Sequence, residues 1–164
     1  MQSTLVSQKV DHSVLRTNQA FIVGLLIAAF VSEARWLVVF VMAVMLYGTF
    51  VMRGAGFGPL YRRIFKPLGW LKPDVIPDHS EPHVFAQEFG GVVLLGSVLA
   101  LYLGAPAAGW ALVWLVIALA ALNLFVGLCA GCMVYYWLNR LGVPGFSANP
   151  MPGAFPGMRP PRNG

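Results

Sequence analysis

The stretch WALVWLVIALAALNLFVGLCAGCMVYYWL, residues 110–138, decides the fold of this chain. It contains no Asp, Glu, Lys or Arg, and it is longer than the roughly 20 apolar residues that a helix needs to cross a lipid bilayer. The stretch therefore predicts a membrane-spanning helix over residues 110–138.

The composition of the whole chain agrees with a membrane location. Apolar residues make up 58% and charged residues 10% of the sequence, and the mean hydropathy is +0.71, whereas charged residues are about 25% of an average soluble domain. We therefore expect an integral membrane protein. A chain of 164 residues has no room for a separate soluble catalytic domain, so any site must be built from the membrane helices and their connections.

Three further apolar stretches lie before residues 110–138 in the chain, and they predict spans over residues 14–31, 36–52 and 84–104. The links between paired spans are short, so each pair forms an antiparallel hairpin. The predicted fold is an all-α membrane protein, a bundle of four transmembrane helices in two antiparallel hairpins. This membrane domain covers residues 1–142, and a Pro/Gly-rich cytoplasmic tail follows over residues 143–164. Asp11 or Ser13 is the expected cap of the first helix.

The basic residues predict how the bundle is oriented. With four spans, ten of the 11 Lys and Arg residues lie on one side and only Arg35 lies on the other. Because Lys and Arg are retained in the cytoplasm, both termini are expected there. No cleavable signal peptide is expected, since a second apolar run follows the first almost at once. The basic residues border the spans without forming a dense run, which favours membrane lipids over nucleic acid as partners.

The connection between the second and third spans predicts an interfacial amphipathic helix. Its apolar residues recur at helical spacing, namely Leu60, Tyr61, Ile64, Phe65, Leu68 and Leu71. Arg62, Arg63 and Lys66 occupy the other face, where they would contact anionic headgroups, so the helix can be a plain surface anchor. Pro67 would kink or end it. Residues 73–78 are then expected to form a stiff extended turn, and Ser80 to cap the third span.

The two cysteines of the chain, Cys129 and Cys132, lie three residues apart in the last apolar run. Two interpretations are open. Cysteine packs readily inside apolar bundles, so both can be core residues. At this spacing on a helix the Cα atoms are about 5 Å apart, within reach of a disulfide, so both can instead form a redox dithiol. A position toward the C-terminal end of a helix disfavours the thiolate, and a helix break at Gly127 or Gly131 would remove that objection.

Counting along the last hairpin places other polar residues near the cysteines. His83 precedes Ala107, at the turn, by as many residues as Gly131 follows it, so the two are expected at one depth. Arg16, Asn18 and Gln87 are expected in the same layer. Arg16, His83 and Gln87 are therefore candidate groups for polarising the dithiol. Structural alternatives are open, because Arg16 can reach headgroups, His83 can be a hydrogen-bonded structural residue, and Asn18 can form hydrogen bonds between helices.

The segment His79-Ser80-Glu81-Pro82-His83 is a weak alternative for a metal site, with His79, Glu81 and His83 as ligands. Pro82, between the two histidines, makes this a weak signal. No metal and no cofactor is therefore predicted.

Four motifs together resemble a known family. They are Val10-Asp11-His12-Ser13-Val14-Leu15-Arg16-Thr17-Asn18-Gln19, Gly58-Pro59-Leu60-Tyr61-Arg62, Glu81-Pro82-His83-Val84-Phe85-Ala86-Gln87 and Cys129-Ala130-Gly131-Cys132-Met133-Val134-Tyr135. The chain resembles the uncharacterised bacterial membrane family catalogued as domain of unknown function 4395. The resemblance implies four membrane helices in the bacterial cytoplasmic (inner) membrane and no assigned activity. It also implies an association with thioredoxin-like and rhodanese-like proteins.

Two functional hypotheses follow. The first is a membrane protein whose Cys129 and Cys132 exchange with a thioredoxin-like or rhodanese-like cytoplasmic partner. The second is a non-catalytic accessory or scaffold subunit of a larger membrane complex, indicated by small residues such as Gly96, Ala100 and Gly104 and by a proline-rich tail that is extended unless a partner orders it. A small transporter is less favoured because the spans contain no acidic residue in mid-membrane.

Overall fold

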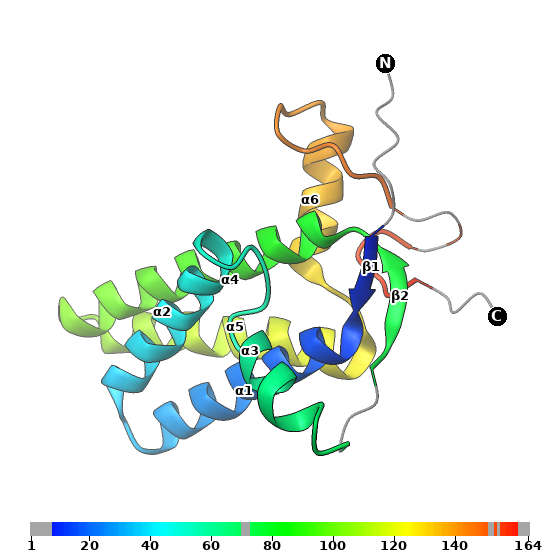
Figure 1. The fold of residues 1–164 in the computed structure, drawn as a ribbon. Helices are drawn as coiled ribbons and strands as arrows, with labels where there is room; N and C mark the ends of the chain where they lie inside the picture. The colour runs from blue at the N-terminus through cyan, green and yellow to red at the C-terminus, as the bar shows by residue number, and fades with distance from the viewer. Residues whose placement is uncertain (1–7, 70–72, 151–152, 154, 161–164) are drawn as a thin grey trace.

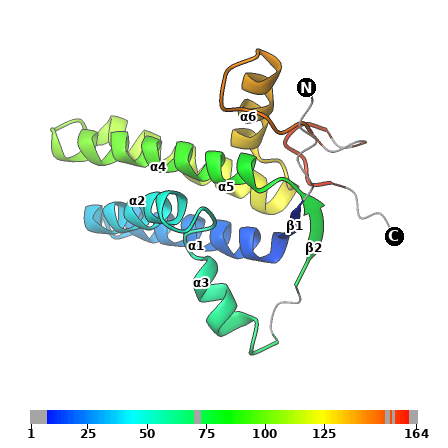
Figure 2. The same ribbon diagram turned by 45° about the horizontal axis from the view of Figure 1, so that its top comes forward.

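Four long helices form the body of the protein, which a computed structural model describes over residues 8–69, 73–150, 153 and 155–160. They are α1 (His12–Val31), α2 (Arg35–Phe50), α4 (Ser80–Tyr102) and α5 (Pro106–Val126). The helices lie side by side along one direction (Figure 1), in two layers that Figure 2 separates clearly, with α1 and α2 in one layer and α4 and α5 in the other. The predicted hairpins are confirmed.

The core lies between these layers. Leu26, Val38, Val41, Leu94 and Val113 are completely buried there. Burial of a Leu or Val side chain contributes about 1.5–3 kcal/mol in water, but between membrane helices close packing carries more of the stability. The same interior accommodates one hydroxyl, because buried Ser97 donates a hydrogen bond to the carbonyl of Gly109 at 2.8 Å.

The number of spans differs from the prediction. Among the described helices, α1, α4 and α5 are long and apolar enough to cross a membrane. Helix α2 has 16 residues, which corresponds to about 24 Å at the α-helical rise and is shorter than a hydrocarbon core of about 30 Å. The helical character of the predicted fold is thus confirmed, whereas its fourth span is not established.

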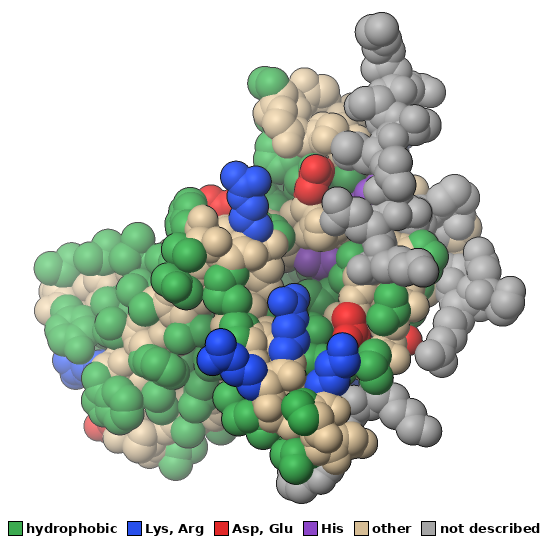
Figure 3. Space-filling view, viewed as in Figure 1, with side chains coloured by type: hydrophobic (Ala, Val, Ile, Leu, Met, Phe, Trp, Pro, Cys, Tyr) green, Lys and Arg blue, Asp and Glu red, His purple; other side chains and the backbone are tan. Residues whose placement is uncertain are grey.

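The outer surface of the helices is apolar. Large side chains point away from the core, such as Trp36, Phe50 and Phe125, with exposed fractions of 67%, 68% and 80%. On the face shown in Figure 3, hydrophobic side chains cover the left part, away from β1 and β2, and most charged side chains lie nearer the strands. A soluble protein rarely exposes so much contiguous apolar surface, so this surface and the three long helices indicate a membrane-embedded protein.

The predicted amphipathic helix is shorter than expected. It consists of α3 (Gly58–Leu60) and a π-helical turn, η1 (Tyr61–Phe65), and it ends before Pro67. Its charged residues Arg62, Arg63 and Lys66 are exposed, but so are Ile64 and Leu68, whereas Tyr61 is completely buried. The helix is therefore anchored by Tyr61. Leu71 lies outside the described residues.

Residues 75–78 form a strand, which the prediction of an extended turn missed. Strand β2 (Val75–Asp78) pairs with β1 (Gln8–Asp11) in antiparallel register, with Gln8 opposite Asp78 and Asp11 opposite Val75. The predicted cap of α1 is confirmed, since the Asp11 carboxylate accepts a hydrogen bond from the backbone N–H of Ser13 at 3.0 Å. The third span begins at Ser80, and the residue at its cap position is His79 rather than Ser80.

The predicted single helix over residues 110–138 is wrong, because the chain leaves the helix at Gly127. This glycine has φ +74°, a left-handed conformation that other residues adopt only at a cost. A second helix, α6 (Ala130–Arg140), begins three residues later and stands across the direction of α5 (Figure 1). It packs on α4 at Gly131, where an added Cβ would lie 2.5 Å from that of Ala86.

Two of the small residues that suggested a docking surface, Gly96 and Gly104, have structural roles within the chain itself. A Cβ added at Gly96 would lie 3.7 Å from Leu112 of α5. Gly104 follows the end of α4, where φ is +92°, so it belongs to the turn and not to a helical stripe. Gly96 and Gly104 therefore give no support to the hypothesis of an accessory subunit.

Candidate functional site

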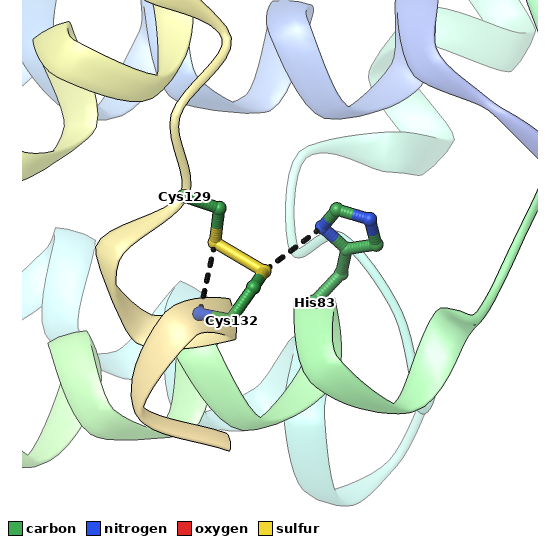
Figure 4. A group of neighbouring side chains, drawn as sticks. All are labelled: His83, Cys129 and Cys132. Atoms are coloured by element: carbon green, nitrogen blue, oxygen red, sulfur yellow. Dashed lines mark hydrogen bonds between the residues drawn. A yellow bond between two sulfur atoms is a disulfide. The ribbon is translucent and has the colours of Figure 1, made fainter. Parts of the chain in front are cut away.

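Cys129 and Cys132 form a disulfide at the start of α6 (Figure 4). Their Cα atoms are 5.2 Å apart, close to the spacing expected for residues three apart on a helix. Both side chains are buried, with residue exposures of 5% and 2%. The pair lies at the end of the helix bundle that also carries β1 and β2 (Figure 1).

The helix break changes the electrostatic setting of the sulfurs. Cys129 is the N-cap of α6, and its Sγ accepts a hydrogen bond from the backbone N–H of Cys132 at 3.3 Å. The expectation that the thiols sit toward the C-terminal end of a helix was wrong, because the helix stops at Gly127 and starts again at Ala130. A helix N-terminus stabilises negative charge, and thiolates in particular, so the fold favours a reactive thiolate at Cys129.

His83 is the polar side chain closest to the disulfide in the described hydrogen-bond network. Its Nδ1 lies 3.4 Å from the Sγ of Cys132, and Figure 4 shows the ring directed toward that sulfur. Its other ring nitrogen, Nε2, lies 3.0 Å from the carboxylate of Asp78. Because an ionised carboxylate only accepts hydrogen bonds, Nε2 carries the proton, and in the neutral ring the lone pair of Nδ1 faces the sulfur.

Asp78 organises this end of the molecule. It is buried, and its carboxylate accepts hydrogen bonds from Nε2 of His12 at 3.1 Å, from His83 and from the backbone N–H of His79 at 2.7 Å. Burial raises the pKa of Asp78, but the hydrogen bonds to His12 and His83, the positive potential of His83 and the backbone donor outweigh it and hold that pKa well below its usual value. Asp78 is therefore an anion whose position fixes both histidine rings.

A cavity of about 170 Å³ opens beside the sulfurs. Residues from α1, β2, α4, α5, α6 and the tail contribute to its wall, among them Arg16, Asp78, His83, Cys129, Cys132, Tyr136 and Met158. Burial, together with the negative charge of Asp78, raises the pKa of Tyr136 to about 12, so Tyr136 presents a neutral hydroxyl. The wall combines the sulfur pair with hydrogen-bonding groups and two exposed cations, Arg16 and Arg159.

The candidate polarising groups lie in different places. His83 reaches the sulfur, and Arg16 lines the same cavity. Gln87 does not face the disulfide, because its amide donates hydrogen bonds to the carbonyls of Met45 and Gly54 and accepts one from Asn18. Gln87 and Asn18 thus tie α1, α2 and α4 together.

The alternative metal ligands do not converge. The carboxylate of Glu81 accepts a hydrogen bond from the hydroxyl of Tyr135 at 2.8 Å, and the backbone of His79 binds Asp78. Among the described residues, the close groups of metal-binding atoms are His83 with Cys129 and Cys132, and His12 with Asp78 and His83.

Part of the tail covers the disulfide. The carbonyl of Gly157 accepts a hydrogen bond from the N–H of Cys129 at 2.8 Å, and the N–H of Arg159 donates to the carbonyl of Gly127 at 3.1 Å. Leu128 and Met158 form an antiparallel bridge between these contacts. The guanidinium of Arg159 forms an ion pair with Asp74. The described part of the tail is therefore ordered by the chain itself, which the prediction of a tail awaiting a partner did not foresee.

Release of this tail is expected to expose Cys129. Gly157 has φ +84°, and an added Cβ would lie 2.8 Å from the carbonyl oxygen of Cys129. The left-handed conformation alone costs about 1–2 kcal/mol, so we expect Gly157→Val to raise the alkylation rate of Cys129 in the reduced protein by about tenfold. Maleimide labelling followed by peptide mapping measures this rate.

Gly145→Val is the matched control, because Gly145 also has a positive φ, of +100°, but no atom within 4 Å of an added Cβ. It should leave the alkylation rate of Cys129 unchanged. Equal rates in the wild type and Gly157→Val would show that the tail does not protect the sulfur.

Sequence reasoning missed Asp78, His12 and the tail contacts. Asp78 and His12 come together only because β1 pairs with β2, and strands of four residues carry little signal.

Comparison with known proteins identifies a family but no function. No curated protein and no solved structure matches the chain. One family model matches residues 10–140, a range that contains His12, Asp78, His83 and both cysteines but ends before the tail residues that cover them. The chain therefore belongs to the family described as Domain of unknown function (DUF4395), as its motifs predicted.

Proposed function

We propose that this protein is a dithiol–disulfide protein of the bacterial cytoplasmic membrane, in which Cys129 and Cys132 exchange with a soluble partner. The observation that carries the proposal is the Cys129–Cys132 disulfide at a helix N-terminus, with His83 at 3.4 Å from one sulfur. Cysteines that only pack a core need neither a capping N–H nor a histidine held by a buried carboxylate.

The proposed membrane arrangement has both termini in the cytoplasm. It is supported by the apolar outer surface of the helices and by the position of Arg35, whose guanidinium donates a hydrogen bond to the carbonyl of Leu101 near the end of α4 remote from the disulfide. In this arrangement residues 1–142 form the membrane domain with α2 as a short fourth span, and residues 143–164 form the tail. The exposed Arg62, Arg63 and Lys66 then contact anionic headgroups.

The proposed exchange begins on the reduced protein. The Cys129 thiolate attacks one sulfur of a partner disulfide, which forms a mixed disulfide and releases the other partner thiolate to take up a proton. Cys132 then passes its proton to Nδ1 of His83 and attacks the Sγ of Cys129, which closes the Cys129–Cys132 disulfide and releases the second partner thiolate. The second partner thiolate takes the proton from His83, so the partner gains two electrons and two protons. The two electrons and this proton come from the membrane protein, and the other proton comes from water, which received it when Cys129 ionised. The reverse sequence oxidises a partner dithiol.

Two soluble partner classes suit this chemistry, as the resemblance to the family implied. A thioredoxin-like protein supplies the disulfide or dithiol of the exchange. A rhodanese-like protein supplies a persulfide; Cys129 then accepts the outer sulfur, and attack by Cys132 releases it as hydrogen sulfide while the disulfide closes. Arg16 lines the cavity and would attract the thiolate or persulfide anion.

Counting reactive thiols tests the proposal. When the purified protein is reduced and then denatured, it should take up two maleimide groups; when it is oxidised and then denatured, it should take up none. A reduced thioredoxin-like protein should convert the oxidised form to the reduced form, and the disulfide form of that partner should reverse the change. Because the chain has no other cysteine, a membrane-impermeant maleimide on inverted and right-side-out vesicles also tests the orientation. Thiols that never cycle, or that react only from the outer side, would contradict the proposal.

A further inference from the structure

Opening the disulfide leaves three metal-binding atoms in one place. The two Sγ atoms and Nδ1 of His83 lie within 4.8 Å of one another, and Figure 4 shows the histidine ring and both sulfurs converging on the same side of the α6 N-terminus. We infer that the reduced protein binds one Zn²⁺ ion through Cys129, Cys132 and His83.

The identity of the ligands favours zinc. A pair of cysteines separated by two residues, together with a histidine, is a donor set that Zn²⁺ prefers. Two thiolates balance the charge of the ion in a site where both cysteines are buried. Without the ion, the two negative charges would repel each other and lack solvation.

The surroundings hold the histidine ligand in the required state. Nε2 of His83 donates to Asp78, and Asp78 is held in turn by His12, whose ring packs edge-on against that of His83 at a centroid distance of 5.8 Å. A carboxylate on the far nitrogen of a ligating histidine fixes its tautomer and orientation and commonly changes metal affinity 10–100-fold. This arrangement of His83, Asp78 and His12 exists even in the disulfide form, so the disulfide only has to be reduced for the three ligands to be ready.

The three ligands leave one coordination position open. The cavity of about 170 Å³ borders both cysteines and His83, so a water molecule or a thiolate ligand can complete a tetrahedral site. Arg16 borders the same cavity but is exposed, which lets its charge remain solvated and lets it accompany an anionic fourth ligand.

Metal binding is tied to the redox state. Two electrons and two protons, supplied by a reduced dithiol protein or by a phosphine in the laboratory, convert the disulfide to two thiols, and Zn²⁺ then displaces two protons into solution. The disulfide form has no thiolate to offer. The inference rests on the proposed function only in requiring that the disulfide opens reversibly.

Cobalt substitution tests the site. The full-length protein in detergent is reduced with a phosphine, exchanged into anaerobic buffer and titrated with Co²⁺. We expect thiolate-to-cobalt charge-transfer and tetrahedral d–d absorption that saturates at one ion per chain and disappears on adding one equivalent of Zn²⁺. The oxidised protein should show neither. Cys132→Ser and His83→Ala should each remove the tetrahedral spectrum, and Asp78→Asn should weaken binding by about 10–100-fold.

His79→Ala is the matched control, since His79 lies four residues from His83 but in neither close group of metal-binding atoms; its spectrum should equal that of the wild type. The site is refuted if the reduced wild type binds no Co²⁺ or if the spectrum survives in His83→Ala. A dithiol that cycles with a thioredoxin-like protein but binds no Co²⁺ would refute the metal site alone. Stoichiometric Co²⁺ binding by thiols that never exchange with the partner would refute the proposed function alone.

Discussion

Cys132→Ser is expected to capture a stable mixed disulfide on Cys129 and to abolish the two-electron redox couple completely. Cys129 has the position that favours a thiolate, with its Sγ on the N–H of Cys132 at the start of α6. Without Cys132 no second thiol can attack the adduct. Treating the reduced variant with glutathione disulfide should give one stable glutathione adduct per chain by mass spectrometry, whereas the wild type should pass through the adduct and finish as the internal disulfide.

The mirror variant Cys129→Ser is the control for this result. It retains Cys132, which is 2% exposed and has no capping N–H of its own among the described contacts. We expect its adduct to form more slowly than that of Cys132→Ser. If the two variants react equally fast, the assignment of Cys129 as the attacking thiol is wrong.

Asp78→Ala is expected to destabilise the protein by several kcal/mol, because each buried hydrogen-bonding group left without its partner costs about 1–3 kcal/mol. The change leaves the ring nitrogens of His12 and His83 without their acceptor and removes the group that joins β2 to α1 and α4. Denaturant unfolding of the detergent-solubilised protein measures the loss, with maleimide labelling of the reduced form as a local readout of the cysteines.

Asp74→Ala is the control for Asp78→Ala, because it lies in the same connection and its ion pair with Arg159 is partly exposed. Such pairs contribute about 0–1 kcal/mol, so its stability should stay close to that of the wild type. Equal losses in the two variants would show that Asp78 has no special structural role.

Lowering the pH should remove the contribution of Asp78 to the free energy of unfolding. The pKa of Asp78 is lower in the folded protein than in the unfolded chain, where an aspartate has a pKa of about 3.9. Its ionised form therefore stabilises the fold above about pH 4, and this contribution is lost as the pH falls through the folded-state pKa. The difference in unfolding free energy between the wild type and Asp78→Asn should accordingly shrink below about pH 4.

The sequence was sufficient to predict the helices and their pairing. Uninterrupted apolar runs and links as short as residues 32–34 leave few alternatives for antiparallel helices. The count of residues from Ala107 also placed His83 and Gly131 at one depth, and the structure has His83 beside Cys132 and Gly131 against Ala86. These predictions depend on helical geometry alone.

The helix break and the carboxylate were not predictable in the same way. The run from Trp110 to Leu138 is apolar throughout, and a lone glycine such as Gly127 is tolerated within many helices. The break is compensated by backbone hydrogen bonds to Gly157 and Arg159, which lie outside the apolar run. Asp78 reaches His12 through a strand pairing that connects residues more than 60 positions apart. Contacts of this kind between distant segments leave no local pattern.

The pairing of Leu128 with Met158 has a consequence for how a soluble partner reaches the sulfurs. The tail is tethered to the same chain, and short flexible tethers correspond to effective concentrations in the millimolar range. A partner must therefore compete with a strand-like segment that is always present. A partner with an exposed strand can displace this segment and accept the hydrogen bond from the N–H of Cys129 in its place. Recognition by main-chain exchange would then favour partners that share an exposed strand and a reactive sulfur, so that small disulfides react with Cys129 more slowly than such a partner does.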